Sequence, residues 1–148
     1  MTQRAIVTGG GQGIGAEIVR GLVSAGYWVG VLDQNAAAAE RLVTELGSSE
    51  VLPVDVCDQL AVSNAIQRFG ALHLLVNNAG ITRDTLMMRM TEEQWDEVIN
   101  TNLKSAFNLT KAVIKPMLKA RSGSIINMSS VVGVKGNAGQ ANYAASKA

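Results

Sequence analysis

Five short apolar runs alternate with amphipathic segments along this chain, and this alternation constrains its fold more than any other feature. The runs lie at residues 5–7, 28–32, 51–56, 72–76 and 125–128. Apolar residues at helical spacing follow each run. Strands that are apolar on consecutive residues are typical of a parallel sheet covered by helices on both faces. The alternation therefore predicts a doubly wound α/β fold.

Size and charge narrow the class of protein. A chain of 148 residues predicts one domain, 1–148, with a substantial core. Because 13 Lys and Arg residues balance 12 Asp and Glu residues, no basic field favours nucleic acid or an acidic membrane. One cysteine, Cys57, excludes an intramolecular disulfide, and with a single histidine no metal-ligand set is expected. The apolar stretch at the N-terminus is too short for a signal peptide, so we expect a soluble, cytoplasmic protein.

Polar or glycine-rich segments follow all five apolar runs. They are Thr8 to Gly15, Asp33, Asp55 to Asp58, Asn77 to Gly80, and Ser129-Ser130. In a doubly wound sheet, ligands bind beyond the carboxyl ends of the strands. Because the carboxyl ends of parallel strands share one edge, we expect a functional site there.

The first of these segments is a glycine loop. It does not match G-x-G-x-x-G, and Ala16 and Glu17 stand where a P-loop requires Lys and Ser or Thr, which argues against an NTPase. Glycines without Cβ atoms still let a pyrophosphate approach the backbone, and the N-terminus of the following helix favours an anion. The loop predicts a dinucleotide phosphate site. The alternative is a turn that only joins strand to helix.

Asp33 follows the second run, 18 residues beyond Gly15. An acidic residue at about this place typically binds the adenosine ribose hydroxyls and repels a 2′-phosphate. This favours NAD(H) as the cofactor, while NADP(H) is not excluded. In the alternative interpretation Asp33 caps the next helix, although Asn35 could do so instead.

Tyr143 and Lys147 are spaced i and i+4, which makes them neighbours on one helix face. A phenol normally titrates near ~10, and a nearby cation stabilises its phenolate, so the pair suits general acid/base catalysis. Ser130, at the end of the fifth run, could orient a substrate carbonyl. A hydrolase is disfavoured because Met128 to Val132 lacks a G-x-S-x-G elbow and the only histidine, His73, lies at the opposite end of its strand.

Together these motifs resemble the short-chain dehydrogenase/reductase family. The residues that carry the resemblance are Thr8-Gly9-x-x-x-Gly13-Ile14-Gly15, Asn77-Asn78-Ala79-Gly80, Ser130 and Tyr143-x-x-x-Lys147. Residues 75–90 and 129–147 are similar to bacterial 3-oxoacyl-[acyl-carrier-protein] reductases, and acetoacetyl-CoA reductases are a near second. The resemblance covers essentially all 148 residues. It implies a Rossmann-type sheet with five of the family's seven strands present.

The resemblance implies four catalytic residues, Asn102, Ser130, Tyr143 and Lys147. Tyr143 would protonate the substrate oxygen while hydride arrives from the nicotinamide, and Ser130 would orient the carbonyl. Lys147 would lower the pKa of Tyr143 and hold the nicotinamide ribose, and Asn102 would kink its helix and hold a proton-relay water. The cofactor-binding residues implied are Gly9, Gln12, Gly13, Ile14, Gly15, Asp33, Asp55, Val56, Asn78, Ala79, Gly80, Tyr143 and Lys147.

The implied activity is NAD(P)-dependent reduction of a 3-oxoacyl thioester of acyl carrier protein or CoA to its 3-hydroxyacyl form, in fatty acid biosynthesis. A homo-oligomer, dimer or tetramer, is also implied. Typical members prefer NADPH and often carry a basic residue where Gln12 stands, or after the second strand. Here Gln12 is neutral and Asp33 acidic, which is a departure toward NAD(H).

The family's chains continue well beyond the position of Ala148. The chain could be a fragment of a longer enzyme or a natural short form, and we expect the 148-residue chain alone to be weakly active or inactive. The alternative function is a non-catalytic nucleotide-binding module or an incomplete subunit. Two expectations follow. Lys147 would lie in a frayed terminal turn with its side chain poorly fixed. The fifth strand would be an exposed edge that is prone to aggregation.

Overall fold

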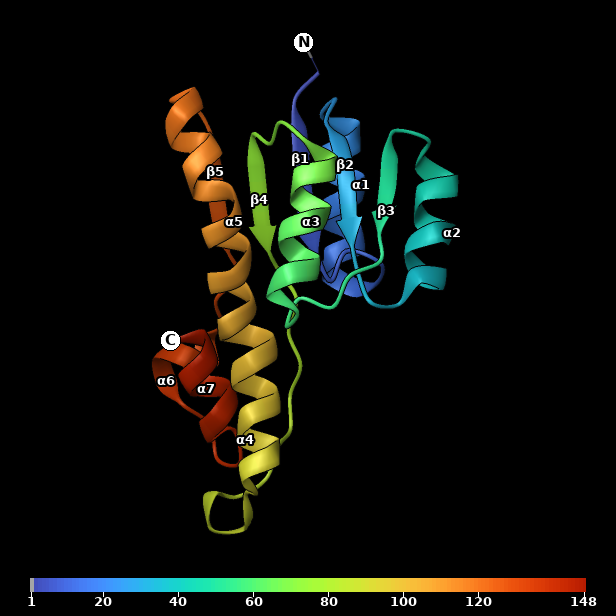
Figure 1. Cartoon of the computed structure of the whole chain (residues 1–148). Helices are drawn as coiled ribbons and strands as arrows, with labels where there is room; N and C mark the ends of the chain where they lie inside the picture. The colour runs from blue at the N-terminus through green and yellow to red at the C-terminus, as the bar shows by residue number, and fades with distance from the viewer. Residues whose placement is uncertain (1) are drawn as a thin grey trace.

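The computed structural model describes residues 2–148, and a five-stranded parallel sheet forms its centre (Figure 1). The strand order is β3-β2-β1-β4-β5. The strands are β1 (Arg4–Thr8), β2 (Trp28–Leu32), β3 (Ser49–Leu52), β4 (Leu74–Asn77) and β5 (Ser124–Asn127). All four strand pairings are parallel, as the apolar runs predicted. The order reverses between β1 and β4, the switch point where doubly wound sheets bind ligands.

Helices cover both faces of the sheet. The helices are α1 (Gly13–Ser24), α2 (Ala36–Leu46), α3 (Gln59–Phe69), α4 (Glu92–Ile99), α5 (Ser105–Ala120), α6 (Val131–Lys135) and α7 (Ala141–Lys147). One apolar cluster joins the sheet to α1 and α2, and a second joins its other face to α3 and α5. The doubly wound α/β fold is therefore confirmed. No helix among residues 2–148 is long and apolar enough to cross a membrane.

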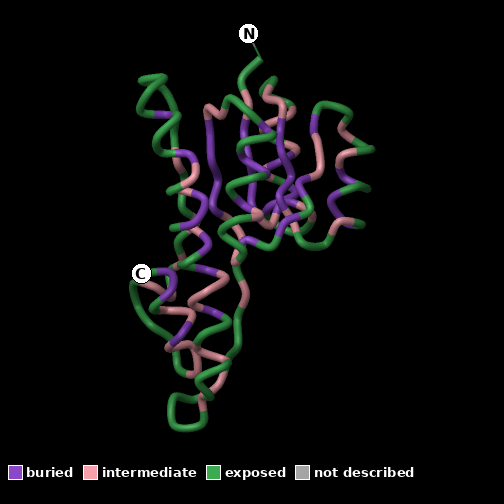
Figure 2. Tube along the Cα trace, in the orientation of Figure 1, coloured by how far each residue is buried: buried purple, intermediate pink, exposed green. Residues whose placement is uncertain are grey.

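A long helical segment carries the chain beyond the sheet. It consists of α4, a π-helix η2 (Asn100–Lys104) and α5, and it is preceded by a short 3₁₀ turn, η1 (Met87–Arg89). Figure 1 shows α6 and α7 packed against its lower part, below the carboxyl edge of the sheet. Figure 2 shows that the sheet is mostly buried and that the lower tip of the molecule is exposed.

Three local features differ from the sequence prediction. The third strand ends at Leu52 rather than at residue 56, because Pro53 has no N–H for a strand ladder. Val54 and Val56 are nevertheless buried, which explains their apolar pattern. Helix α6 was not predicted, and the sequence did not specify a π-helical turn, although this turn lies where the resemblance implied that Asn102 kinks the long helix. The fifth strand forms an edge of the sheet and is largely exposed, as expected.

Candidate active site

The glycine loop is tied to the end of β4 at the switch point. The hydroxyl of Thr8 accepts hydrogen bonds from the backbone N–H groups of Asn78 and Ala79, at 3.0 and 2.9 Å. The side-chain amide of Asn78 donates to the carbonyls of Thr8 and Gly9, at 3.0 and 3.2 Å. Asn78 is therefore a clamp on the loop, since its amide holds the first turn after β1.

Two glycines of the loop cannot carry a side chain without disturbing this clamp. A Cβ atom on Gly15 would overlap the carbonyl of Gly9 and lie 2.7 Å from Nδ2 of Asn78. Gly9 itself has a φ of +62°, a left-handed conformation that other residues rarely adopt. The absence of Cβ atoms lets the loop close directly onto the turn after β4.

Helix α1 begins at Gly13 with its N-terminus open to solvent. Its N-cap residue, Gln12, makes no side-chain cap hydrogen bond, and no acidic residue lies in the first turn. Free N–H groups and the helix dipole favour an anion at this point. Ile14, in the same turn, is 68% exposed.

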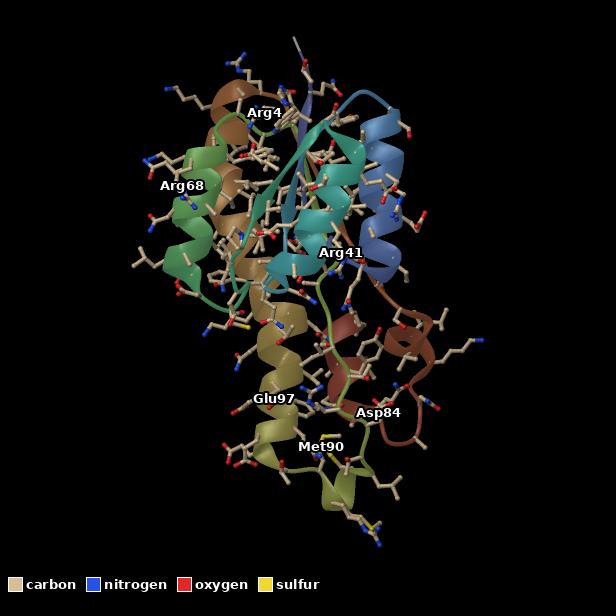
Figure 3. The ribbon with its side chains drawn as sticks, turned by 90° about the vertical axis from the view of Figure 1, so that its right-hand side faces the viewer. Arg4, Arg41, Arg68, Asp84, Met90 and Glu97 are labelled. Carbon is tan, nitrogen blue, oxygen red and sulfur yellow. The ribbon has the colours of Figure 1, made fainter. Side chains whose placement is uncertain are left out.

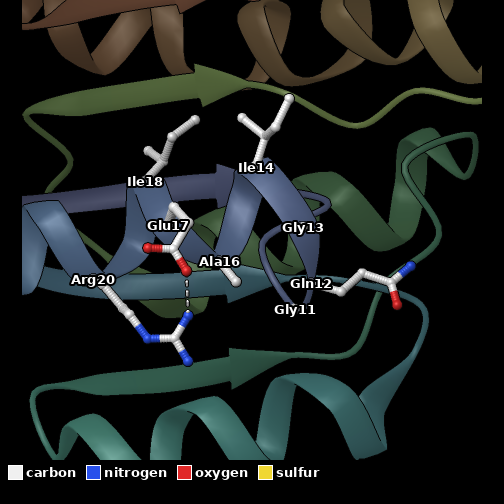
Figure 4. Close-up of a pocket in the computed structure, with 8 residues that line it drawn as sticks. All are labelled: Gly11, Gln12, Gly13, Ile14, Ala16, Glu17, Ile18 and Arg20. Carbon is white, nitrogen blue, oxygen red and sulfur yellow. Dashed lines mark hydrogen bonds and ion pairs between the residues drawn. The ribbon is translucent and has the colours of Figure 1, made fainter.

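A surface hollow of about 840 Å³ runs from this loop along α1 (Figure 4). Figure 4 shows Ile14 and Ile18 on one side of the helix and the Glu17–Arg20 pair on another. The Arg20 guanidinium lies 2.9 Å from carboxylate oxygens of both Glu17 and Glu45. The charge of Arg20 is therefore already paired with two carboxylates.

Asp33 stands at the end of β2, against the glycine loop. One carboxylate oxygen accepts from the N–H of Gly11 at 2.9 Å, and the other accepts from Asn35 N–H at 2.9 Å. The cap of α2 is Asn35, whose side chain accepts from Ala38 N–H. The interpretation of Asp33 as the helix cap is therefore wrong, and its carboxylate instead supports the loop.

Asp55 and Val56 follow β3 on the face of the sheet that α3 and α5 cover. The side chain of Asp55 accepts from Cys57 N–H at 2.9 Å, and the carbonyl of Val56 accepts from the amide of Asn108 on α5. They share the carboxyl edge with the glycine loop, and their contacts are with the segment before α3 and with α5.

Lys147 is held firmly near the end of α7. The residue is 9% exposed, and its Nζ donates to the carbonyl of Met128 at 2.9 Å. The carbonyl of Lys147 accepts from the hydroxyl of Ser129 at 2.8 Å. The expected frayed turn with a poorly fixed lysine is therefore wrong, because the segment after β5 satisfies both groups. Burial lowers the pKa of Lys147.

Ser130 stands at the start of α6, the helix that packs against α7. Ser130 caps α6, with its hydroxyl accepting from Val132 N–H at 3.2 Å. Helix α6 packs so closely on α7 that a Cβ atom on Gly133 would overlap the carbonyl of Lys147. Tyr143 lies one turn before Lys147 on the same helix and is half-buried.

Asn102 lies in the π-helical turn and makes three side-chain hydrogen bonds. Its Oδ1 accepts from Ile81 N–H at 2.8 Å, and Nδ2 donates to the Ile81 carbonyl at 3.0 Å and to the Ser146 hydroxyl at 2.9 Å. The turn is wider than an α-helical turn because the backbone N–H of Ser105 donates to the carbonyl of Asn100. The hydroxyl of Ser105 donates to the carbonyl of Thr101. A Cβ atom on Gly80 would lie 3.4 Å from both Asn102 Oδ1 and Lys147 Nζ. Gly80, Asn102 and Lys147 therefore converge.

Sequence reasoning missed two buried polar residues on α7, Asn142 and Ser146. Both are buried, whereas Tyr143 is half-buried, and the only indication in the sequence is their own i, i+4 spacing. His73 lies just before β4 and accepts from Arg4 N–H, a structural contact at the far end of the strand, as predicted. Within residues 2–148, His, Cys, Asp and Glu residues form no group of three that could hold a metal ion.

Comparison with known proteins gives one consistent result. The family described as short chain dehydrogenase matches residues 3–148. Two proteins named 3-oxoacyl-[acyl-carrier-protein] reductase FabG, from Chlamydia trachomatis and Staphylococcus aureus, are 46% and 45% identical over 157 aligned residues. Another of the same name, from Chlamydia muridarum, is 47% identical. Each alignment covers 100% of this chain, which spans 63–64% of the length of these relatives.

Proposed function

This chain belongs to the short-chain dehydrogenase family, and from that premise we propose that it acts in an oxidoreductase that reduces a 3-oxoacyl thioester with a nicotinamide cofactor. The observation that carries the proposal is the convergence of Gly80, Asn102 and Lys147 beside the clamped glycine loop. The names of the relatives supply the substrate class, a 3-oxoacyl group on acyl carrier protein or, alternatively, on CoA.

The residues at the switch point fit a dinucleotide. The backbone of Gly9, Gly13 and Gly15, with the open N-terminus of α1, offers N–H groups and no side chains to a pyrophosphate. The carboxylate of Asp33 has lone pairs left after its two backbone contacts, and these can accept from ribose hydroxyls.

The chemistry falls to residues on α7 and the turn after β5. A bound nicotinamide cofactor supplies the hydride. In our proposal Tyr143 gives its phenolic proton to the carbonyl oxygen as the carbonyl carbon gains the hydride. Ser130 donates a hydrogen bond to the same oxygen, and the Lys147 ammonium, one helical turn from Tyr143, stabilises the negative charge left on the phenol oxygen. Ketone, hydride and proton together give the 3-hydroxyacyl product.

Replacing Tyr143 with Phe tests the proposed acid. We expect the turnover of acetoacetyl-CoA with NADH to fall by about 10²–10⁴-fold, the usual contribution of a positioned acid, while NADH binding changes little. The matched control is Tyr27→Phe, since Tyr27 is the only other tyrosine and packs between α1 and β2. Activity in Tyr143→Phe close to that of the Tyr27→Phe control would overturn the assignment.

The non-catalytic alternative is separated by the same assay. If the wild-type protein binds NADH but reduces neither acyl-CoA nor acyl-carrier-protein substrates, it is a nucleotide-binding module. Self-association and the specific partner remain predictions from the resemblance, and the location in the cell remains a prediction from the composition.

We also propose that the cofactor is NAD(H) rather than NADP(H), because the Asp33 carboxylate would face the 2′ position of the adenosine ribose. The nearly isosteric variant Asp33→Asn removes the charge and keeps an acceptor for Gly11 N–H. We expect wild type to bind NADH more tightly, and the variant to shift the NADPH/NADH affinity ratio by about tenfold or more toward NADPH, measured by fluorescence titration. A wild-type preference for NADPH would contradict the proposal.

A further inference from the structure

Helix α7 carries two neighbouring pairs of polar residues. Tyr143 and Lys147 form the pair assigned to the chemistry, and Asn142 and Ser146 form the second pair, one residue earlier. Asn142 is fully buried and Ser146 is 7% exposed. Buried polar side chains on a seven-residue helix are costly unless their hydrogen bonds are satisfied, so their partners indicate what they do.

The hydroxyl of Ser146 links two parts of the site. It donates to the carbonyl of Tyr143 at 2.8 Å and accepts from Nδ2 of Asn102 at 2.9 Å. A hydroxyl has one proton, and an amide nitrogen can only donate, so these two bonds fix each other's direction. The other hydrogen of the Asn102 amide goes to the Ile81 carbonyl. Both amide hydrogens of Asn102 are therefore committed.

Asn142 anchors the other end of the helix. Its Nδ2 donates to the carbonyls of Arg83 and Gln94, both at 3.1 Å, and its Oδ1 accepts from Tyr143 N–H. The loop it contacts is tied to α4 by an Arg83–Glu97 ion pair, and Figure 3 shows Glu97 and Asp84 in this lower part of the molecule. Asn142 thus fixes the first turn of α7, and Ser146 holds the second turn.

We propose that Ser146 is a positioning residue that couples the π-helical turn carrying Asn102 to the backbone of Tyr143. By this link the turn after β4, from Gly80 to Ile81, and the Tyr143–Lys147 pair keep one relative placement. The inference rests on the proposed function for its catalytic consequence. Its structural part, the coupling of Asn102 to α7, does not depend on turnover.

The kinetic test compares wild type with the Ser146→Ala variant in the complete protein. In Ser146→Ala we expect kcat to fall about five- to tenfold, as for the loss of one hydrogen bond that acts through geometry. The KM for the thioester and the affinity for NADH should stay within about twofold, and the pH profile of kcat should shift. The control is Ser49→Ala, which removes a buried hydroxyl at the amino end of β3 that has no hydrogen-bond partner among residues 2–148.

A double-mutant cycle separates coupling from general loosening. If Ser146 acts through Asn102, adding Ser146→Ala to Asn102→Ala should lower kcat by less than about twofold more. Additive losses, or an unchanged kcat and pH profile in a folded Ser146→Ala protein, would overturn the proposal.

NMR of the Asn102 side-chain amide gives a readout that does not need activity. In NADH-bound Ser146→Ala we expect these amide hydrogens to shift and exchange faster with solvent, and in Ser49→Ala to remain as in wild type. Absence of turnover in wild type would refute the proposed function and the catalytic role together. An unchanged Asn102 amide in Ser146→Ala would refute the coupling itself.

Discussion

At the scale of single residues, Lys147 holds its ammonium group in a nearly closed environment. The Met128 carbonyl is its hydrogen-bond acceptor, and burial is the cause that lowers its pKa from the ordinary value of 10.5. Desolvation disfavours the charged form, whereas the unfolded chain solvates it fully. The folded protein therefore gives up this proton at a lower pH than the unfolded chain does.

This difference predicts how stability depends on pH. Between the lowered folded pKa of Lys147 and 10.5 the unfolded chain binds more protons, so the free energy of unfolding should rise with pH in that window. Below the folded pKa both states are protonated and the slope vanishes. Urea denaturation of wild type and Lys147→Met, from neutral pH upward, isolates this residue. Wild type should gain stability relative to the variant as the pH approaches 10.5, and a constant or falling difference would contradict the prediction.

At the scale of elements, α4 is held at its start by a reciprocal cap. The hydroxyl of Thr91 accepts from Gln94 N–H at 3.2 Å, and Gln94 Oε1 accepts from Thr91 N–H at 3.1 Å. Glu92 and Glu93 in the first turn complement the helix dipole. The backbone carbonyl of the same Gln94 receives the Asn142 amide, so the cap supports the helix that carries Tyr143.

Loss of this cap should therefore lower the stability of the protein by a measurable amount. We expect Thr91→Ala to lower the free energy of unfolding by about 1 kcal/mol, within the usual range for such caps. Thr91→Ser keeps the accepting hydroxyl and is the matched control. Equal losses in the two variants, measured by chemical denaturation, would show that the methyl group and not the cap matters.

At the scale of the whole molecule, two apolar features face outward. Strand β5 pairs with β4 alone within the described residues, and Ile126 on it is 47% exposed. The outer side of η2 and α5 presents four exposed apolar residues at helical spacing: Leu103, Phe107, Ile114 and Leu118. An edge strand with free backbone groups and apolar side chains is a template for association.

The edge predicts concentration-dependent association of the 148-residue chain. Ile126→Lys places a charge on the edge and should reduce light scattering at a given concentration. Leu60→Lys, at an exposed position of α3, adds the same charge away from the edge and controls for net charge. If both variants reduce association equally, charge rather than the edge is responsible.

Local sequence patterns were sufficient to predict those structural features that depend only on neighbouring residues. The apolar runs predicted the parallel strands, and the i, i+4 spacing put Tyr143 and Lys147 on one helix face. Turn geometry and side-chain periodicity act over a few residues, so they can be read directly from the order of residue types.

The placement of the site depended on contacts between distant segments. Asn102 meets Ile81 and Ser146, which are 21 and 44 residues away, and the Lys147 amine meets Met128, 19 residues away. Such contacts form only when the sheet order and helix packing bring the segments together, and no local periodicity encodes them. The sequence by itself therefore determined the kinds of elements and which side chains share a face. The tertiary structure alone decided that Lys147 is buried, that Asp33 holds Gly11 of the glycine loop, and that Ser146 joins Asn102 to Tyr143.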